Sequence, residues 1–456
     1  MKKWLLFGFC IFLSVPLFSH EQISTKFLTD ANVKKELKLL FKRSSAGKEK
    51  FSNHKITEQI QQNLQQPFSA DGFTFSKPII GADVSRGNAE YPWQLVVFLA
   101  DRDRPLTETL NQLRYRVKQG TLVQASLLVT PRVYDKDPLK VEQMYFIYND
   151  GTQPVIEHFQ ADHLQNTQEL LSTLVNYMEE DTANLYTGVI VDAHGNGESM
   201  VYKKRQQETY FSVEQLLEPF REKDMKVDLL VLDSCKMSSF FSLYYLTKAA
   251  RVEYLVASSD IMYATSEVMY YHILRFLDYQ PKEAAIRAVR YRPRFLQLNP
   301  SMHTTNAGVL DLKRLREPLK EWTGEYYAVF HSMPEMDREL KKWFSQEDTL
   351  RSFSRTVSLQ KKYVEENADK IGSSCNRETI RQEFLQASTA LLDALSESTL
   401  TQWCYSPKAN RLFWERIPNN DCLESVSVDK GQLDLVLETN ANELSDYARK
   451  YICRFR

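Results

Sequence analysis

The sequence lacks an excess of charge of either sign. Its 456 residues include 58 lysines and arginines against 59 aspartates and glutamates. A near-neutral chain has no long-range field that attracts phosphate groups, so we expect neither nucleic acid nor an anionic membrane surface as a partner. Any preference for a charged ligand must come from individual residues at a site.

Apolar runs long enough to span a bilayer are also missing. The longest run, Trp4–Phe18, follows two lysines and precedes the small residue Ser19, which is the pattern of a secretory signal. We expect residues 1–19 to be removed, leaving an exported protein that is periplasmic, on the cell surface or secreted, with no stable membrane insertion. Because Leu17-Phe18-Ser19 matches a cleavage site poorly, an uncleaved anchor is the alternative.

Cysteine is scarce, and no C-x-x-C or H-x-x-x-H spacing occurs, so the sequence predicts no metal site and requires no cofactor. After the signal, Cys235 stands alone in the middle of the chain. In an oxidising compartment the remaining cysteines predict two disulfides with three possible pairings, and four buried thiols are the alternative. These four lie in the last fifth of the chain: Cys375, Cys404, Cys422 and Cys453.

Trypsin-like catalytic motifs are absent as well. Ile79-Ile80-Gly81 resembles the start of a mature serine protease, but neither G-D-S-G-G nor A-A-H-C occurs in the chain. The serine and histidine of that mechanism are therefore lacking.

What the sequence does contain is an alternation of short apolar runs and helix-period segments, typical of an α/β fold around a parallel sheet. We expect a polar pro-segment or linker at residues 20–80, a core at 81–320, and a mainly helical region at 321–456 with some strand near Leu433–Leu437. The expected core strands are Leu95–Leu99, Ala125–Val129, Tyr145–Tyr148, Gly188–Val191, Val227–Leu232 and Tyr254–Ala257.

Two of these strands end at residues with catalytic chemistry. The strand Gly188–Val191 is followed by His194, and the strand Val227–Leu232 is followed by Cys235. One helix is predicted between the two strands, after a Ser212–Gln215 capping box. Strands joined by one helix run parallel, so their carboxyl ends meet at one edge of the sheet. We therefore expect His194 and Cys235 to lie at a shared rim.

A thiol attacks a peptide carbonyl as thiolate, so it needs a base that takes its proton. His194 is the candidate for that base and for the acid that protonates the leaving amine. The amide of Gly195 is a candidate donor to the oxyanion. The alternatives without catalysis are a histidine in an ordinary turn and a buried structural cysteine.

Strand-His-Gly followed by strand-Asp-x-Cys resembles the clostripain family of cysteine peptidases, relatives of the caspases and gingipains. The likeness extends from about Trp93 to Leu312 and includes Asp233-Ser234-Cys235-Lys236-Met237. It implies a caspase-like α/β/α sandwich, a Cys235–His194 dyad, and cleavage after Arg or Lys with Asp233 meeting the substrate cation. It also implies self-cleavage, for which Lys203-Lys204-Arg205 and Lys42-Arg43 are candidates, with simple solvated loops as the alternative, and it allows a calcium requirement.

The chain departs from the family pattern around both catalytic residues. Ala193 stands where an aspartate is usual, Glu198 replaces a common tryptophan, and Lys236 follows the nucleophile where leucine is usual. The alternatives for Lys236 are a charge that favours the thiolate, a solvated lysine without a role, and a charge that opposes Asp233. These departures leave an alternative function, an inactive exported binding protein with a peptidase-like core.

Overall fold

The computed structural model describes residues 90–100, 106–131, 141–161, 164, 166–178, 183–204, 207–260, 269–291, 305–332, 351–370, 377–406, 411–414, 426–428 and 430–449. All of them belong to one compact unit, Gly87–Arg456. The expected signal peptide, the expected pro-segment and three of the C-terminal cysteines lie outside the described residues.

The described residues form a ten-stranded mixed sheet with the order β14-β13-β11-β10-β9-β5-β1-β2-β3-β4. Its five central strands, from β10 to β2, are parallel, and antiparallel strands extend both sides. The strands of this sheet are β1 Trp93–Leu99, β2 Leu122–Val129, β3 Gln143–Asn149, β4 Pro154–Gln160, β5 Tyr186–Asp192, β9 Val227–Asp233, β10 Val252–Ala257, β11 Thr305–Asp311, β13 Thr399–Ser406 and β14 Arg411–Trp414.

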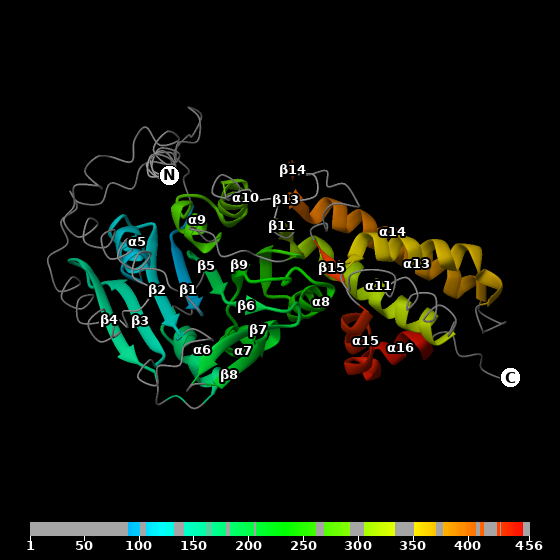
Figure 1. Ribbon diagram of the computed structural model, residues 1–456, viewed down its shortest axis with the longest axis horizontal. Helices are drawn as coiled ribbons and strands as arrows, with labels where there is room; N and C mark the ends of the chain where they lie inside the picture. The colour runs from blue at the N-terminus through cyan, green and yellow to red at the C-terminus, as the bar shows by residue number, and fades with distance from the viewer. Residues whose placement is uncertain are drawn as a thin grey trace, which may run out of the picture. The chain divides into compact units, whose positions relative to one another are not determined.

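The central strands are mostly apolar, as expected for parallel strands whose two faces are both covered by helices. Figure 1 shows α5, α9 and α10 on one face and α6, α7 and α8 on the other. This layering confirms the expected α/β/α architecture. The helices are α5 Leu106–Lys118, α6 Thr167–Asn176, α7 Val213–Glu222, α8 Phe240–Ala249, α9 Met269–Arg275 and α10 Pro281–Tyr291.

Helix α7 begins where the sequence predicts it. The Ser212 hydroxyl accepts from the Gln215 amide while the Gln215 side chain accepts from the Ser212 amide, which completes the capping box. The apolar face of α7 is buried against the sheet. Helix α7 is thus the crossover that joins β5, through a small hairpin sheet, to β9.

The region after residue 320 is mainly helical, as expected, but two of its strands, β13 and β14, continue the central sheet beyond β11. Helix α11 runs across the expected boundary at 320 and packs on α8, and the division into two domains stays a prediction. The elements of this region are α11 Leu312–Ser332, β12 Arg351–Ser352, α13 Phe353–Glu366, η3 Ala368–Lys370, α14 Arg377–Ser398, β15 Ser427–Val428, α15 Lys430–Thr439 and α16 Ala441–Arg449.

The prediction of a strand near Leu433–Leu437 is wrong, because these residues lie in helix α15. The run Leu-Asp-Leu-Val-Leu alternates in a way typical of strands, but the structure buries it with helical spacing. Leu433, Val436 and Leu437 are buried, whereas Leu435 is 39% exposed. Burial at positions i, i+3 and i+4 is the pattern of one helix face.

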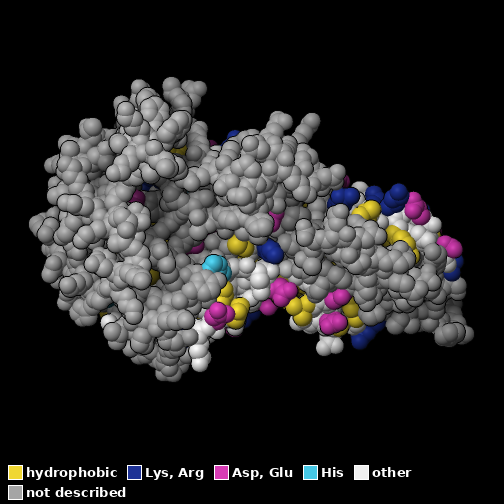
Figure 2. Space-filling view, viewed as in Figure 1, with side chains coloured by type: hydrophobic (Ala, Val, Ile, Leu, Met, Phe, Trp, Pro, Cys, Tyr) yellow, Lys and Arg dark blue, Asp and Glu magenta, His cyan; other side chains and the backbone are white. Residues whose placement is uncertain are grey.

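Cys404 is disulfide-bonded, and its partner lies outside the described residues. This agrees with the expectation that C-terminal cysteines pair, while the pairing itself stays a prediction. Among the helices in the described ranges, none is both long and apolar enough to cross a membrane. On the face drawn in Figure 2, acidic and basic side chains of the described residues are interspersed.

Candidate active site

The two strands that carry the predicted dyad are direct neighbours. β5 and β9 pair in parallel, and Asp192 lies opposite Asp233 at their ends. His194 and Cys235 each follow two residues later. Paired strands lie about 4.8 Å apart, so both loops leave the same edge of the sheet side by side. The prediction that the two strands are parallel neighbours in the sheet is confirmed.

The two loops are also in contact beyond the strands. A Cβ atom added to Gly195 would lie 2.6 Å from the carbonyl oxygen of Cys235 and 3.1 Å from the sulfur of Met237. Since real Cβ atoms do not approach a backbone oxygen so closely, only glycine fits at position 195 in this arrangement. The loop after β5 therefore packs directly against the backbone of the candidate nucleophile.

Cys235 sits in a tight turn at the end of β9. It is a half-buried, reduced thiol. Lys236, the next residue, has φ 63°, a left-handed conformation that costs a side chain other than glycine or asparagine about 1–2 kcal/mol. The turn is held by backbone hydrogen bonds, in which the Lys236 amide donates to the Asp260 carbonyl and the Ser238 amide to the Ser258 carbonyl, both at 2.8 Å.

The loop that receives these bonds, residues 258–260 after β10, is itself fixed by Asn306 of β11. The Asn306 side-chain oxygen accepts from the Ser258 hydroxyl at 2.7 Å and from the Ser259 amide at 3.0 Å, while its Nδ2 donates to the Ser259 hydroxyl at 2.7 Å. Asn306 is 3% exposed. The nucleophile turn is therefore anchored through buried bonds to two further strands, an arrangement that the sequence analysis did not identify.

His194 is exposed and begins a small antiparallel sheet of β6 His194–Gly195, β7 Ser199–Lys204 and β8 Gln207–Ser212. The hairpin turns at Gly197, whose φ of 97° suits the first central position of a type II′ turn. The Asn196 side chain accepts from the amides of Glu198 and Ser199. We call residues 194–199 the His hairpin.

The hydrogen-bond alternation of this hairpin determines where the Gly195 amide points. The Asn196 amide donates to the Ser199 carbonyl, so that pair is hydrogen-bonded across the ladder. The next pair, Gly195 with Met200, is then a non-hydrogen-bonded pair. The Gly195 amide consequently points away from β7, as an oxyanion donor would have to.

Asp233 is the last residue of β9 and is 4% exposed, beside Asp192 at 1%. The alternation that suggested a face shared by Asp233 and Cys235 does not reach Cys235, because the strand ends at Asp233 and a bend and turn follow. The proximity of the two residues along the chain remains, but the strand period no longer sets their relative direction. Asp260 adds a second acidic residue beside this turn.

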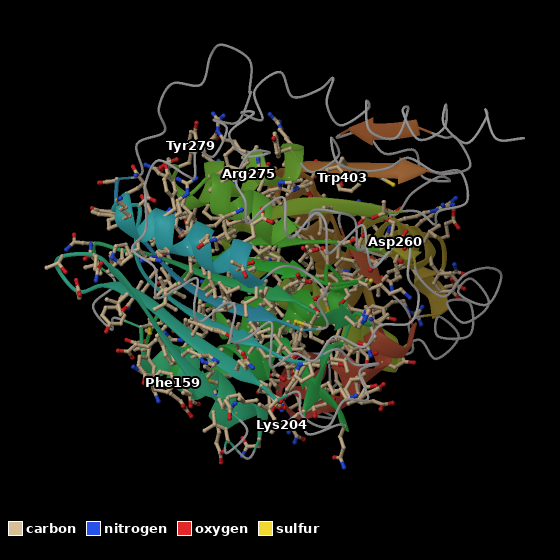
Figure 3. All side chains as sticks on the ribbon, turned by 60° about the vertical axis from the view of Figure 1, so that its left-hand side comes forward. Phe159, Lys204, Asp260, Arg275, Tyr279 and Trp403 are labelled. Carbon is tan, nitrogen blue, oxygen red and sulfur yellow. The ribbon has the colours of Figure 1, made fainter. Side chains whose placement is uncertain are left out.

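The candidate self-cleavage segment lies within the hairpin sheet. Lys203 and Lys204 are in β7 and are 5% and 6% exposed, and the Lys204 ammonium donates to the Leu164 carbonyl at 2.7 Å. Figure 3 shows Lys204 on the opposite side of the sheet from Arg275 and Tyr279. Arg205 lies outside the described residues. Cleavage after either lysine would require β7 to leave its ladder.

Metal ligands do not gather at this site. Among the described residues, no group of three or more His, Cys, Asp or Glu side chains could hold a metal ion. A calcium requirement stays a prediction.

The comparisons with known proteins point to one family. A model described as the clostripain family matches residues 123–317, a range that contains both His194 and Cys235. No curated protein matches the chain.

Solved structures also match the chain, at low sequence identity. An inactive zymogen C11 protease from Parabacteroides distasonis is 13% identical, with 79% of this chain and 99% of that chain covered and a TM-score of 0.47. A secreted C11 cysteine protease from Bacteroides thetaiotaomicron is 12% identical, with the same shares covered and a TM-score of 0.47. Another structure, of a secreted C11 cysteine protease from Bacteroides thetaiotaomicron in complex with an irreversible peptide inhibitor, is 13% identical, with 78% of this chain and 99% of that chain covered and a TM-score of 0.47.

Proposed function

We propose that this protein is an exported cysteine endopeptidase that hydrolyses peptide bonds after Arg or Lys, since a model of the clostripain family matches residues 123–317. The observation that carries the proposal is the register of β5 and β9, which starts the His194 and Cys235 loops from opposite positions on neighbouring strands. The contact of Gly195 with the Cys235 backbone supports it.

The proposed reaction needs two half-steps. The Cys235 sulfur, having given its proton to His194, attacks the substrate carbonyl carbon, and the Gly195 amide donates to the developing oxyanion. His194 then returns the proton to the leaving amine as the C–N bond breaks and a thioester remains. A water molecule, deprotonated by His194, attacks the thioester, and the thiol leaves with the carboxylate product released.

The preference for Arg or Lys is assigned to Asp233. It is a buried carboxylate two residues before the nucleophile, and a charge-assisted hydrogen bond from a substrate guanidinium is strong in such a setting. Lys236 lies next to Cys235 and is half-buried, so its ammonium opposes this preference to the extent that it faces the same pocket.

The test of the reaction is hydrolysis of Arg and Lys reporter peptides by the full chain. We expect Cys235→Ala and His194→Ala each to lower kcat/KM by at least about 1,000-fold, because the dyad acts as a unit. A peptidyl-Arg electrophile should modify Cys235 in the wild type, as read by mass spectrometry. Absence of both hydrolysis and labelling in the folded wild type would favour the inactive binding protein instead.

The test of selectivity is a panel with Arg, Lys and Ala before the scissile bond. Asp233→Asn should lower kcat/KM for the Arg and Lys reporters by about 10- to 100-fold, which corresponds to one charged hydrogen bond of about 1.5–3 kcal/mol. The Ala reporter is the control and should be nearly unaffected. Equal losses on all three reporters would remove Asp233 from the cation pocket.

Export, self-processing and calcium dependence belong to the same proposal. Amino-terminal sequencing of the mature protein tests removal of residues 1–19 and reveals any cut after Lys42-Arg43. Identical fragment patterns for wild type and Cys235→Ala would reject self-cleavage. Because Lys203 and Lys204 are buried in β7, a cut there is expected only after the hairpin opens. An activity that survives a calcium chelator would reject the calcium requirement.

A further inference from the structure

The tip of the His hairpin is bound to the helix that follows Cys235. The Gly197 carbonyl oxygen accepts from the Ser239 hydroxyl and, at 3.3 Å, from the Ser242 hydroxyl. Both serines are 0% exposed. A carbonyl oxygen has two lone pairs, so these two donors satisfy it fully.

The Ser239 hydroxyl is directed from both sides. Ser239 is the N-cap of α8, and its oxygen accepts from the Ser242 amide at 3.1 Å while its proton goes to Gly197. A hydroxyl has one proton to donate, so the cap fixes the orientation in which that proton meets the hairpin. Ser239 is four residues after Cys235, and Gly197 is three residues after His194.

The C-terminal region also contacts the hairpin tip and the start of α8. A Cβ atom on Gly197 would lie 2.5 Å from Nε2 of Gln432, so this buried amide of α15 lies against the hairpin tip. On the other side of Ser239, the Ser427 amide of β15 donates to the Ser238 carbonyl at 2.9 Å. We call Gly197, Ser239, Ser242 and Gln432 the tip junction.

The tip junction has a consequence for the dyad. His194 begins the hairpin, in a strand that is only two residues long. The hairpin continues from β5 at its base, and at its tip the Gly197 carbonyl is bonded to Ser239 and Ser242. Without the Ser239 hydroxyl the carbonyl keeps only the longer bond from Ser242, so the tip shifts and moves the imidazole relative to the thiol.

We propose that Ser239 is a positioning residue that aligns His194 with Cys235 through the Gly197 carbonyl, and that Gln432 makes the C-terminal region part of this support. The inference rests on the proposed peptidase function. It assigns to α15 a role in the active site although α15 lies about 200 residues beyond the nucleophile.

The experiment compares the full-length wild type with Ser239→Ala, Ser239→Thr and Ser212→Ala. We expect Ser239→Ala to lower kcat by about 10- to 100-fold with little change in KM, since displacements near 1 Å cost this much. The pH dependence of Cys235 alkylation by iodoacetamide should move to higher pH, towards that of an ordinary thiol. Ser239→Thr, which keeps the hydroxyl, should recover most of the activity.

Ser212→Ala is the matched control. Ser212 caps α7, which has 10 residues like α8, and it pairs with Ser199 of the His hairpin through the backbone, which alanine keeps. Its variant should show a comparable fall in melting temperature with the wild-type alkylation profile. If Ser239→Ala does not fold, Ser242→Ala keeps the cap, removes one donor to Gly197, and should still lower kcat by a few-fold.

The outcomes separate this inference from the proposed function. Ser239→Ala with the kcat and alkylation profile of Ser212→Ala, in a background where the wild type hydrolyses peptides, overturns the positioning role and leaves the peptidase standing. A wild type that neither hydrolyses peptides nor is labelled at Cys235 overturns both. Unchanged kcat in Gln432→Ala would overturn the part assigned to the C-terminal region.

Discussion

The Cys235 turn and the His hairpin leave the same sheet edge, yet they are held by different kinds of bonds. Backbone amides of Lys236 and Ser238 fix the Cys235 turn to the loop after β10. The hairpin tip is fixed by hydroxyl groups of side chains instead. The Cys235 turn is thus held directly by main-chain bonds, with the Asn306 side chain fixing the loop behind them. The hairpin tip is held directly by side-chain hydroxyl groups, so single substitutions can remove its bonds.

Gly195→Ala should break this arrangement most severely. Its new Cβ would press on the Cys235 carbonyl, a backbone atom that cannot rotate away. We expect kcat/KM to fall by about 100-fold or more, because the two loops must separate. Steady-state hydrolysis of an Arg reporter measures the loss.

Gly120→Ala is the control for that variant. Gly120 has φ 74° and nothing within 4 Å of an added Cβ, so alanine there strains the backbone without displacing a neighbour. It should lower the melting temperature and leave kcat unchanged. A wild-type kcat in Gly195→Ala would show that the two loops accommodate a Cβ at position 195, and would contradict the expected clash with the Cys235 carbonyl.

The part of this site that could be predicted from sequence is the part encoded by local patterns. Four residues around Ser212 define the capping box, and a single helix between two apolar runs makes β5 and β9 parallel neighbours. Each signal depends on residues close together in the chain, so no knowledge of tertiary packing is needed.

The rest could not be predicted, because it depends on contacts between distant segments. Ser239 meets Gly197 across 42 residues, and Gln432 reaches the same glycine from the other end of the chain. Neither contact leaves a period in the sequence. The prediction of a strand near Leu433–Leu437 shows the same limit, since the five residues Leu-Asp-Leu-Val-Leu are compatible with either a strand or a helix period until burial decides.

Alkaline pH should destabilise the fold through two tyrosines whose pKa values are raised in the folded protein. Burial raises the pKa of Tyr202 in β7 to about 12, although the hydrogen bond between Tyr202 and Thr167 opposes the shift, and burial likewise raises the pKa of Tyr254 in β10 to about 12. The folded pKa values exceed the ordinary value of 10. This stabilisation is therefore fully present below pH 10 and is lost as the pH rises from 10 through 12.

We expect the melting temperature to fall steeply above pH 10, and the fall to be shallower in Tyr202→Phe because one buried phenol no longer ionises. Circular dichroism melts between pH 8 and pH 11.5 measure it. Tyr177→Phe, at a tyrosine that is 46% exposed, is the control and should keep the wild-type slope. Identical slopes for all three proteins would mean that ionisation of Tyr202 does not limit stability.

The smallest expected effects come from relieving backbone strain at two left-handed residues, one inside the candidate site and one outside it. Ala250, at the end of α8, and Lys236, in the nucleophile turn, have nearly equal left-handed φ values of 57° and 63°. Glycine adopts this conformation without a steric cost, but its unfolded chain is more flexible. Ala250→Gly should therefore stabilise the fold by about 0.5–1 kcal/mol and leave kcat unchanged, as chemical denaturation and reporter hydrolysis can measure.

Lys236→Gly should gain similar stability but lose activity by a few-fold, because freeing the residue after Cys235 loosens the turn that presents the thiol. Lys236→Asn distinguishes the backbone from the side chain, since asparagine also tolerates the left-handed region but restricts it more than glycine does. Wild-type kcat in Lys236→Asn with reduced kcat in Lys236→Gly assigns the effect to turn rigidity. Equal losses of kcat in Lys236→Gly and Lys236→Asn assign the effect to the missing ammonium group. The difference from Ala250→Gly would then reflect charge and not backbone strain.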